Sequence, residues 1–366
     1  MIKKLIILSI CFNTISIFGK DLLEFRVKNK IGLIDSSGNV IIEPSYDSIE
    51  LAPFKYSDLA FVYTKGGCGY INKNNLIIIK LEFFECKRFQ GEYAIVIDRW
   101  ECKNHKAIYR QSIIDKNGNI LYSFDDRDLI SYSEGFFVYN LEKERGCGYE
   151  SYSKSSIGSY GFLDKNGKEV PKVKYEFILG FSDGLAIVNS KGKWGIIDSN
   201  FKVVFPIVHD NISPFYSGYS TIQLNNESAT INSKLEIVIP FGDFFSIREF
   251  SDGLASACRK KIPKNLLKIE CTNVIVDEKG TILFEETSDI KYIQHFYDGL
   301  AVASNKNGYQ GLINKSFQWV VNPKYFLANS FQNGATQVYK TQDDYWKNRF
   351  SLIDKEGNVI WKHPDL

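Results

Sequence analysis

The chain has 366 residues, of which 44% are hydrophobic, 14% aromatic and 24% charged, with 27 Gly but only 9 Pro. This composition supplies a hydrophobic core and excludes a chain that is disordered by composition. The 45 basic residues nearly balance the 43 acidic residues, so a formal charge of +2 excludes the broad cationic field that nucleic-acid binding needs. The four histidines are far apart in the sequence. We therefore expect no metal, no cofactor and no nucleic-acid partner.

Residues 1–19 have the layout of a secretory signal. Lys3 and Lys4 precede the apolar run 5–12, and small residues end the segment at Gly19. The run has about eight residues, far fewer than the ~20 that span a bilayer. We expect residues 1–19 to be removed on export, which predicts a periplasmic, surface or secreted location. A buried first strand is the alternative.

A second interpretation concerns Cys11. Residues 8–11 form a loose lipobox, although Ile10 stands where that pattern has Gly, Ala or Ser. Lipidation of Cys11 would anchor the protein to a membrane without spanning it. No later segment reaches 18 consecutive apolar residues, so we expect no transmembrane span.

One short pattern recurs along the rest of the chain: an apolar pair, then Asp or Asn, then a turn. Its copies are about 40 residues apart on average. The nine acidic or amide positions are Asp35, Asn72, Asp115, Asp164, Asp198, Asn232, Asp277, Asn314 and Asp354. Such a period identifies a repeat architecture.

A second pattern, Phe-x-Asp-Gly, lies about fourteen residues upstream in the units without insertions. Its clean copies are residues 181–184, 250–253 and 296–299, and weaker copies are 89–91, 215–218 and 331–334. The Phe is expected to pack between sheets, and Asp-Gly to form the turn that enters the next strand.

The unit around residues 175–205 shows how each repeat is interpreted. Alternating and β-branched residues predict strands over 185–188, 194–198 and 203–205, and a short strand over 175–177. Four short antiparallel strands in ~40 residues is the size of a propeller blade. We therefore predict an all-β fold, most simply a closed β-propeller. Because nine units exceed the four to eight blades usual for a ring, an open β-solenoid or superhelix is the alternative.

The segment Lys193-Trp194-Gly195-Ile196-Ile197-Asp198, preceded by residues 181–186, resembles the WG (KWG) repeat family of bacterial proteins. The resemblance covers residues 21–366 and implies a repeat scaffold of about nine degenerate copies over residues 20–366. Only one copy keeps Trp-Gly. In the others the Trp position is held by Ile31, Cys68, Gln111, Tyr160, Ser228, Asn273, Gln310 and Phe350.

The Asp-x-x-Gly turns, such as residues 115–118, superficially resemble calcium loops. Calcium needs six to eight oxygen ligands, and no copy supplies the distal Glu of an EF-hand. Asp at the first position of a β-turn bonds its own backbone, and Gly at the fourth accepts positive φ. We therefore predict structural turns rather than metal sites.

Three units carry insertions in the first hairpin, at 99–109, 141–159 and 259–270. Extended loops on a rigid stack are where recognition tends to reside, and the third is basic. Its candidate partner-binding residues are Arg259, Lys260, Lys261, Lys264 and Lys268. Beyond Cys11 the chain has six cysteines, an even number that permits disulfides in an exported protein. We predict a Cys258–Cys271 bond, because these residues flank the third insertion.

The function predicted from these features is a non-catalytic, exported scaffold that binds a protein, peptide or glycan through its inserted loops or one face. We expect a monomer. A hydrolase with paired carboxylates in a central funnel is the rival from another class. A structural lipoprotein of the envelope, anchored through Cys11, is a further alternative.

Overall fold

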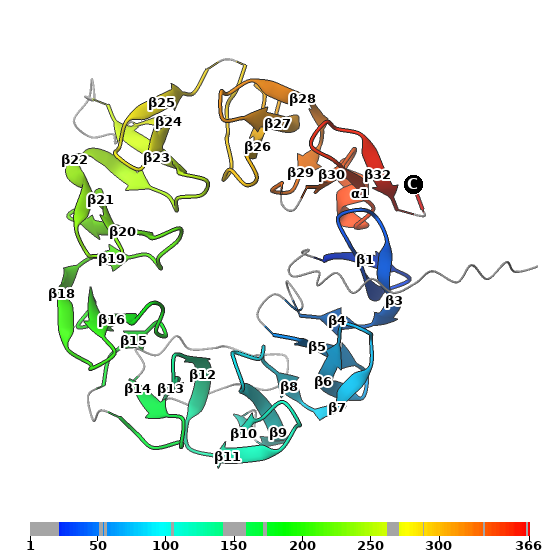
Figure 1. The fold of residues 1–366 in the computed structure, drawn as a ribbon, viewed down its shortest axis with the longest axis vertical. Helices are drawn as coiled ribbons and strands as arrows, with labels where there is room; N and C mark the ends of the chain where they lie inside the picture. The colour runs from blue at the N-terminus through cyan, green and yellow to red at the C-terminus, as the bar shows by residue number, and fades with distance from the viewer. Residues whose placement is uncertain are drawn as a thin grey trace, which may run out of the picture.

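The computed structural model describes residues 22–366 apart from 51–53, 55–56, 104–105, 142–158, 171–173, 262–270, 288, 332–333 and 364. The predicted signal segment and Cys11 lie outside these residues. The described chain forms nine small antiparallel β-modules arranged in a ring around a central opening (Figure 1). The fold is thus a β-propeller, as predicted, with one module for each sequence repeat.

The strands of the first five modules follow the chain in order. Module 1 contains β1 (Leu23–Val27), β2 (Lys30–Ile34) and β3 (Val40–Tyr46). Module 2 contains β4 (Ser48–Ile49), β5 (Leu59–Thr64), β6 (Gly67–Asn72) and β7 (Ile77–Phe83). Module 3 contains β8 (Glu85–Cys86), β9 (Ala94–Lys103), β10 (Lys106–Ile114) and β11 (Ile120–Phe124). Module 4 contains β12 (Asp128–Ser133), β13 (Phe136–Asn140) and β14 (Tyr160–Asp164). Module 5 contains β15 (Phe177–Ile178), β16 (Leu185–Ser190), β17 (Lys193–Asp198) and β18 (Val203–His209).

The remaining four modules complete the ring. Module 6 contains β19 (Asn211–Ile212), β20 (Tyr219–Leu224), β21 (Glu227–Asn232) and β22 (Ile237–Ile247). Module 7 begins with the end of β22 and adds β23 (Leu254–Lys260), β24 (Cys271–Asp277) and β25 (Ile282–Glu285). Module 8 contains β26 (Leu300–Ser304), β27 (Gln310–Asn314) and β28 (Trp319–Tyr325). Module 9 contains β29 (Leu327–Ala328), β30 (Thr336–Tyr339), α1 (Gln342–Trp346), β31 (Ser351–Ile353) and β32 (Val359–Lys362).

Strand order within a module follows chain order. In module 5 the sheet runs β15-β16-β17-β18, with the short β15 towards the central opening and β18 at the outer side of the ring (Figure 1). Modules 6 and 7 depart from this rule because β22 pairs with both β21 and β23, which joins the two modules into one seven-stranded sheet. Helix α1 is a fourth insertion, in the β30–β31 hairpin, that the sequence analysis did not predict.

The repeated Asp or Asn forms an Asx turn in all nine modules. In each copy the Oδ1 atom accepts backbone N–H groups from the residues two and four positions later, at 2.8–3.0 Å. Because both side chains present this oxygen, Asp and Asn exchange freely at this position. Glycines at the fourth position, such as Gly118 and Gly357, have positive φ of 84° and 87°. The structural-turn interpretation is confirmed.

These turns predict a loss of stability in acid. The pKa of Asp164 lies below its usual value because the backbone N–H of Lys168 donates to it. The pKa of Asp115, Asp277 and Asp354 is also lowered, because hydrogen bonds to each carboxylate outweigh its partial desolvation. A depressed folded-state pKa stabilises the fold above the unfolded-state value, near 4, and this contribution disappears as the pH falls through the lower folded-state value.

We therefore expect the melting temperature of the protein to fall between pH 5 and pH 3, measured by circular dichroism. A variant with Asp115, Asp164, Asp277 and Asp354 all changed to Asn should lose less over the same interval, because the amide keeps the turn without titrating. Asn72, Asn232 and Asn314 already show that Asn forms this turn. Equal losses in the two proteins would contradict the prediction.

The Phe-x-Asp-Gly segments form tight turns that we call entry turns. Asp183 and Gly184 both have positive φ, 52° and 76°, as type I′ hairpins require. The flanking Ser182 and Leu185 exchange two backbone hydrogen bonds of 2.9 and 3.1 Å. Phe181 is 4% exposed and packs between modules 4 and 5. The predicted roles of the Phe and of Asp-Gly are confirmed.

The Gly that follows the Trp position allows the outer strand to cross closely. A β-carbon on Gly69 would lie 2.4 Å from the Ile79 and Lys80 carbonyl oxygens, and one on Gly311 would lie 2.2 Å from the Val321 oxygen. Where Gly32, Gly69, Gly195 and Gly311 are present, the outer strands β3, β7, β18 and β28 each have seven residues. The glycine does not alone set the strand length, because Val274 of module 7 lies beside the four-residue β25 and Ala229 of module 6 beside the 11-residue β22.

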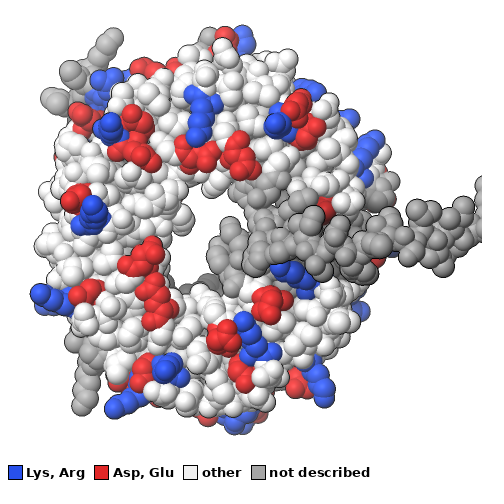
Figure 2. Space-filling model, viewed as in Figure 1, with Lys and Arg blue, Asp and Glu red and all other residues white. Residues whose placement is uncertain are grey.

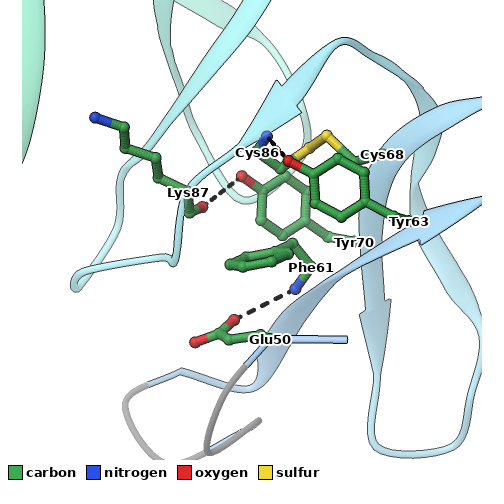
Figure 3. The surroundings of a disulfide bond; sticks show 7 residues. All are labelled: Glu50, Phe61, Tyr63, Cys68, Tyr70, Cys86 and Lys87. Carbon is green, nitrogen blue, oxygen red and sulfur yellow. Dashed lines mark hydrogen bonds between the residues drawn. A yellow bond between two sulfur atoms is a disulfide. The ribbon is translucent and has the colours of Figure 1, made fainter. Parts of the chain in front are cut away.

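Side chains at the Trp position join neighbouring modules. Cys68 on β6 is disulfide-bonded to Cys86 on β8, which starts the next module, 18 residues later (Figure 3). At the same separation, the side-chain oxygen of Gln111 accepts the backbone N–H of Leu129, and that of Gln310 accepts the N–H of Ala328. One pair of positions thus carries a covalent bond at one junction and a hydrogen bond at two others.

The ring closes where module 9 meets module 1. Phe25 and Ile34 of module 1 share a buried cluster with Tyr339, Phe350 and Leu352 of module 9. The His363 Nε2 donates to the Arg26 carbonyl at 2.9 Å, and Gln337 Nε2 donates to the Glu24 carbonyl at 3.3 Å. These contacts favour the closed ring over the open stack. None of the described residues forms a helix long and apolar enough to cross a membrane.

Candidate functional site

The β23–β24 hairpin of module 7 carries the basic insertion. Cys258 on β23 and Cys271 on β24, the pair singled out from the sequence, form a disulfide with a Cα–Cα distance of 5.4 Å. Register pairing continues to Lys260 and Cys271, so the two strands remain paired up to the base of the loop. The disulfide and the ladder therefore hold the start and end of the insertion in a fixed position on the ring.

The basic residues of this hairpin differ in how free their charges are. Lys260 is bound to Glu227 and lies over the Phe245 ring, so its charge is already neutralised within modules 6 and 7. Arg259 and Lys261 are exposed, and no salt bridge forms to Arg259 among the described residues. Lys264 and Lys268 lie outside the described residues. Arg259 and Lys261 are therefore the charges available to a partner.

A pocket of about 250 Å³ lies beside this hairpin, at the junction of modules 7 and 8. One wall is formed by β23, β24 and the end of β25, and the other by residues 291–293, which lead into module 8. Ile275, Ile293 and Phe284 give it an apolar base, and Ser246, Ser256 and Asn273 add polar groups. A small concave site with an apolar floor and a few polar groups is typical of ligand binding.

The pocket exists because two bulky side chains of the repeat are missing from module 7. In module 5, Trp194 pairs with Asn189, and Ile196 with Ile187. The matching pairs in module 7 are Asn273 with Cys258, and Ile275 with Ser256. Trp194 packs into the cluster that fills the junction of modules 5 and 6. In module 7, Asn273 replaces this Trp and Ser256 replaces Ile187. The corresponding space at the junction of modules 7 and 8 therefore stays open.

The pocket is cationic on balance. Arg248 and Lys291 line it together with one carboxylate, Glu286. Asn273 Nδ2 donates to Glu286 at 2.8 Å, and this hydrogen bond lowers the pKa of Glu286. Lys291 and Lys261 lower this pKa further, while partial desolvation of the carboxylate raises it. Lys291 pairs with Glu286 at 3.0 Å. The exposed Arg248 guanidinium has only the Tyr292 hydroxyl within reach, at 3.5 Å, among the described residues.

Acidic side chains border the central opening (Figure 2). Two acidic side chains join entry turns of neighbouring modules: Glu134 accepts the Gly184 N–H at 2.9 Å, and Asp252 accepts the Gly299 N–H at 2.8 Å. Lys315 donates to the Asp252 carbonyl at 2.7 Å. Within the described parts of the chain, no three His, Cys, Asp or Glu side chains are arranged to hold a metal ion. These acidic residues thus connect modules.

Two features of the structure were not predicted from the sequence. The Cys68–Cys86 bond was missed although Cys68 stands at the Trp position, because the 18-residue step to the next module is visible only in the structure. Arg248 and Tyr292 were missed because they lie in connecting segments outside the repeated motifs, Arg248 between β22 and β23 and Tyr292 after β25. One sequence signal could have indicated the pocket: Asn273 and Val274 stand where the repeat has Trp and Gly.

Comparison with known proteins supports the repeat. Five segments match the family described as WG containing repeat: residues 31–68, 69–97, 160–194, 194–227 and 311–346. No curated protein matches the sequence. Among solved structures, the chain is similar to BamB from Moraxella catarrhalis at 12% identity and a TM-score of 0.41, with 92% of this chain and 98% of that chain covered. It is also similar to Hsv2p from Kluyveromyces lactis at 9% identity and a TM-score of 0.38, with 70% and 89% covered.

Proposed function

Because this chain is a WG-repeat protein, we propose that it is an exported ring-shaped scaffold that binds an acidic protein partner through the β23–β24 hairpin. The observation that carries the proposal is the disulfide-anchored hairpin, which presents Arg259 and Lys261 at a fixed place on a rigid ring. Loops held by a rigid framework are common recognition elements. The partner is acidic because exposed cations attract and orient opposite charge.

Two further features support export and a role without chemistry. The Cys68–Cys86 and Cys258–Cys271 disulfides favour an oxidising compartment outside the cytoplasm. The carboxylates of Glu134 and Asp252 take part in hydrogen bonds between modules. The proposed function therefore contains no catalytic step.

The test is site-specific crosslinking in cells that make the protein. A photo-reactive residue placed at Lys261 should form an adduct with an acidic protein. The adduct should be lost when Arg259→Glu reverses the neighbouring charge, and it should weaken with salt, because screening acts on exposed charges. Lys202→Glu, an equal charge reversal on an exposed turn of module 5, is the matched control and should leave the adduct unchanged. An adduct that survives Arg259→Glu would overturn the proposal.

A further inference from the structure

We propose that the pocket between modules 7 and 8 binds an aromatic side chain that neighbours a carboxylate, as part of the acidic partner. The inference rests on the proposed scaffold function, which it makes more specific. At another junction of the same ring, the equivalent space is filled by an aromatic side chain of the repeat.

The shape of the pocket matches an aromatic ring. At the junction of modules 5 and 6, the space beside the third strand is filled by the indole of Trp194, which packs with Ile212 and Ile222 and stands 5.6 Å from the Phe177 ring. At the junction of modules 7 and 8 the equivalent residue is Asn273, which is exposed. The apolar base of the junction is kept by Ile275 and Ile293. The space left open at the junction of modules 7 and 8 therefore suits a flat aromatic ring.

The charges of the pocket favour a ligand with a carboxylate. Glu286 is satisfied by Asn273 and Lys291, at 2.8 and 3.0 Å. Arg248 is exposed at the pocket, and its only polar side-chain contact among the described residues is the Tyr292 hydroxyl, at the long distance of 3.5 Å. A guanidinium in this position offers a fork of N–H donors that matches a carboxylate. The ligand therefore carries its negative charge beside the ring, within reach of Arg248.

The pocket lies next to the basic hairpin. Cys258 lines the pocket and also anchors the basic hairpin, so the pocket and the hairpin share one strand. Lys261 lies close enough to Glu286 to lower its pKa. A partner segment held by the hairpin charges thus passes the pocket. An aromatic residue flanked by acidic residues would use both.

The experiment measures binding of two small probes to the full-length mature protein by isothermal titration calorimetry. N-acetyl-L-tryptophan carries the ring and the carboxylate, and N-acetyl-L-tryptophanamide carries the ring alone. We expect saturable binding of the acid, weaker binding of the amide, and about tenfold weaker binding of the acid to Arg248→Gln. The amide should bind wild type and Arg248→Gln equally, which would assign the lost affinity to the carboxylate contact.

A second variant tests the shape argument. Asn273→Trp restores the residue of the repeat and should abolish binding of both probes while the melting temperature stays equal to or above that of wild type. Lys202→Gln, on an exposed turn of module 5, is the matched control and should bind both probes like wild type. Absent binding to wild type, or unchanged binding to Asn273→Trp or to Arg248→Gln, would overturn the pocket assignment.

The two proposals fail in different ways. If N-acetyl-L-tryptophan binds as expected but the crosslink at Lys261 is insensitive to Arg259→Glu, the pocket stands and the hairpin partner does not. If the crosslink behaves as expected and the probe does not bind, the scaffold function stands and the aromatic pocket does not.

Discussion

Gly69→Ala is expected to destabilise the protein by about 3 kcal/mol, at the upper end of the cost of overpacking a buried site. The added methyl group would lie 2.4 Å from the Ile79 and Lys80 carbonyl oxygens, which belong to the backbone of β7 and do not yield as a flexible side chain would. The seven-residue outer strand would have to move away from β6. The expected readout is a lower urea midpoint, with faster hydrogen exchange in β6 and β7.

The same hairpin contains the control. Gly66 lies three residues earlier, its φ is not in the left-handed region, and the nearest atom to an added β-carbon is the Thr64 Oγ1 at 3.8 Å. Gly66→Ala should therefore change the free energy of unfolding by less than about 0.5 kcal/mol. If the two alanine variants were equally stable, close strand crossing would not be the reason for the glycine of the repeat.

The second large effect is expected from the inter-module disulfide. Replacing Cys68 and Cys86 together by Ala should lower the free energy of unfolding by about 3 kcal/mol, the cost expected for opening a loop of this length. Hydrogen exchange should become faster on both sides of the junction of modules 2 and 3. Tyr63 contributes to this junction, because its hydroxyl accepts the Cys86 N–H at 3.0 Å (Figure 3).

Two matched variants separate this effect from a general cost of losing a disulfide. Cys258→Ala with Cys271→Ala opens a bond inside one hairpin, so faster exchange should stay within β23 and β24. Gln310→Cys with Ala328→Cys places cysteines at the positions equivalent to Cys68 and Cys86, and a new disulfide should form, detected by intact mass before and after reduction. If that disulfide did not form, residues 310 and 328 would not be equivalent in position to Cys68 and Cys86.

Much of the architecture was predictable because it depends on short sequence motifs within each repeat. The Asp or Asn of each Asx turn and the Phe of the entry turn act through contacts within a few residues or with the adjacent sheet. Their period therefore predicts the strands and the number of modules, although modules 1, 4 and 8 have three strands where four were predicted. Closure of nine modules was harder to predict, because it depends on Phe25 and Phe350, at opposite ends of the chain, sharing one cluster.

The remaining features depend on how modules meet, and that is not local. The partner of Cys68 is set by the register between β6 and β8, while the pocket requires Ser256 and Asn273 to be small on two strands that a long insertion separates. Helix α1 has five residues, too few for a helical period to be detected in the sequence. The double role of β22 likewise arises from pairing across a module boundary.

The closing junction has a consequence for chain connectivity. Module 1 and module 9 meet through side-chain packing and hydrogen bonds, and the two modules exchange no strand. In this respect the seam resembles the other junctions except that of modules 6 and 7, which share β22, and modules 1 and 9 are neighbours in the ring (Figure 1). The covalent order of the modules is therefore separable from their circular order. A circular permutant that begins at module 5 and ends with module 4 would encode the same set of junctions.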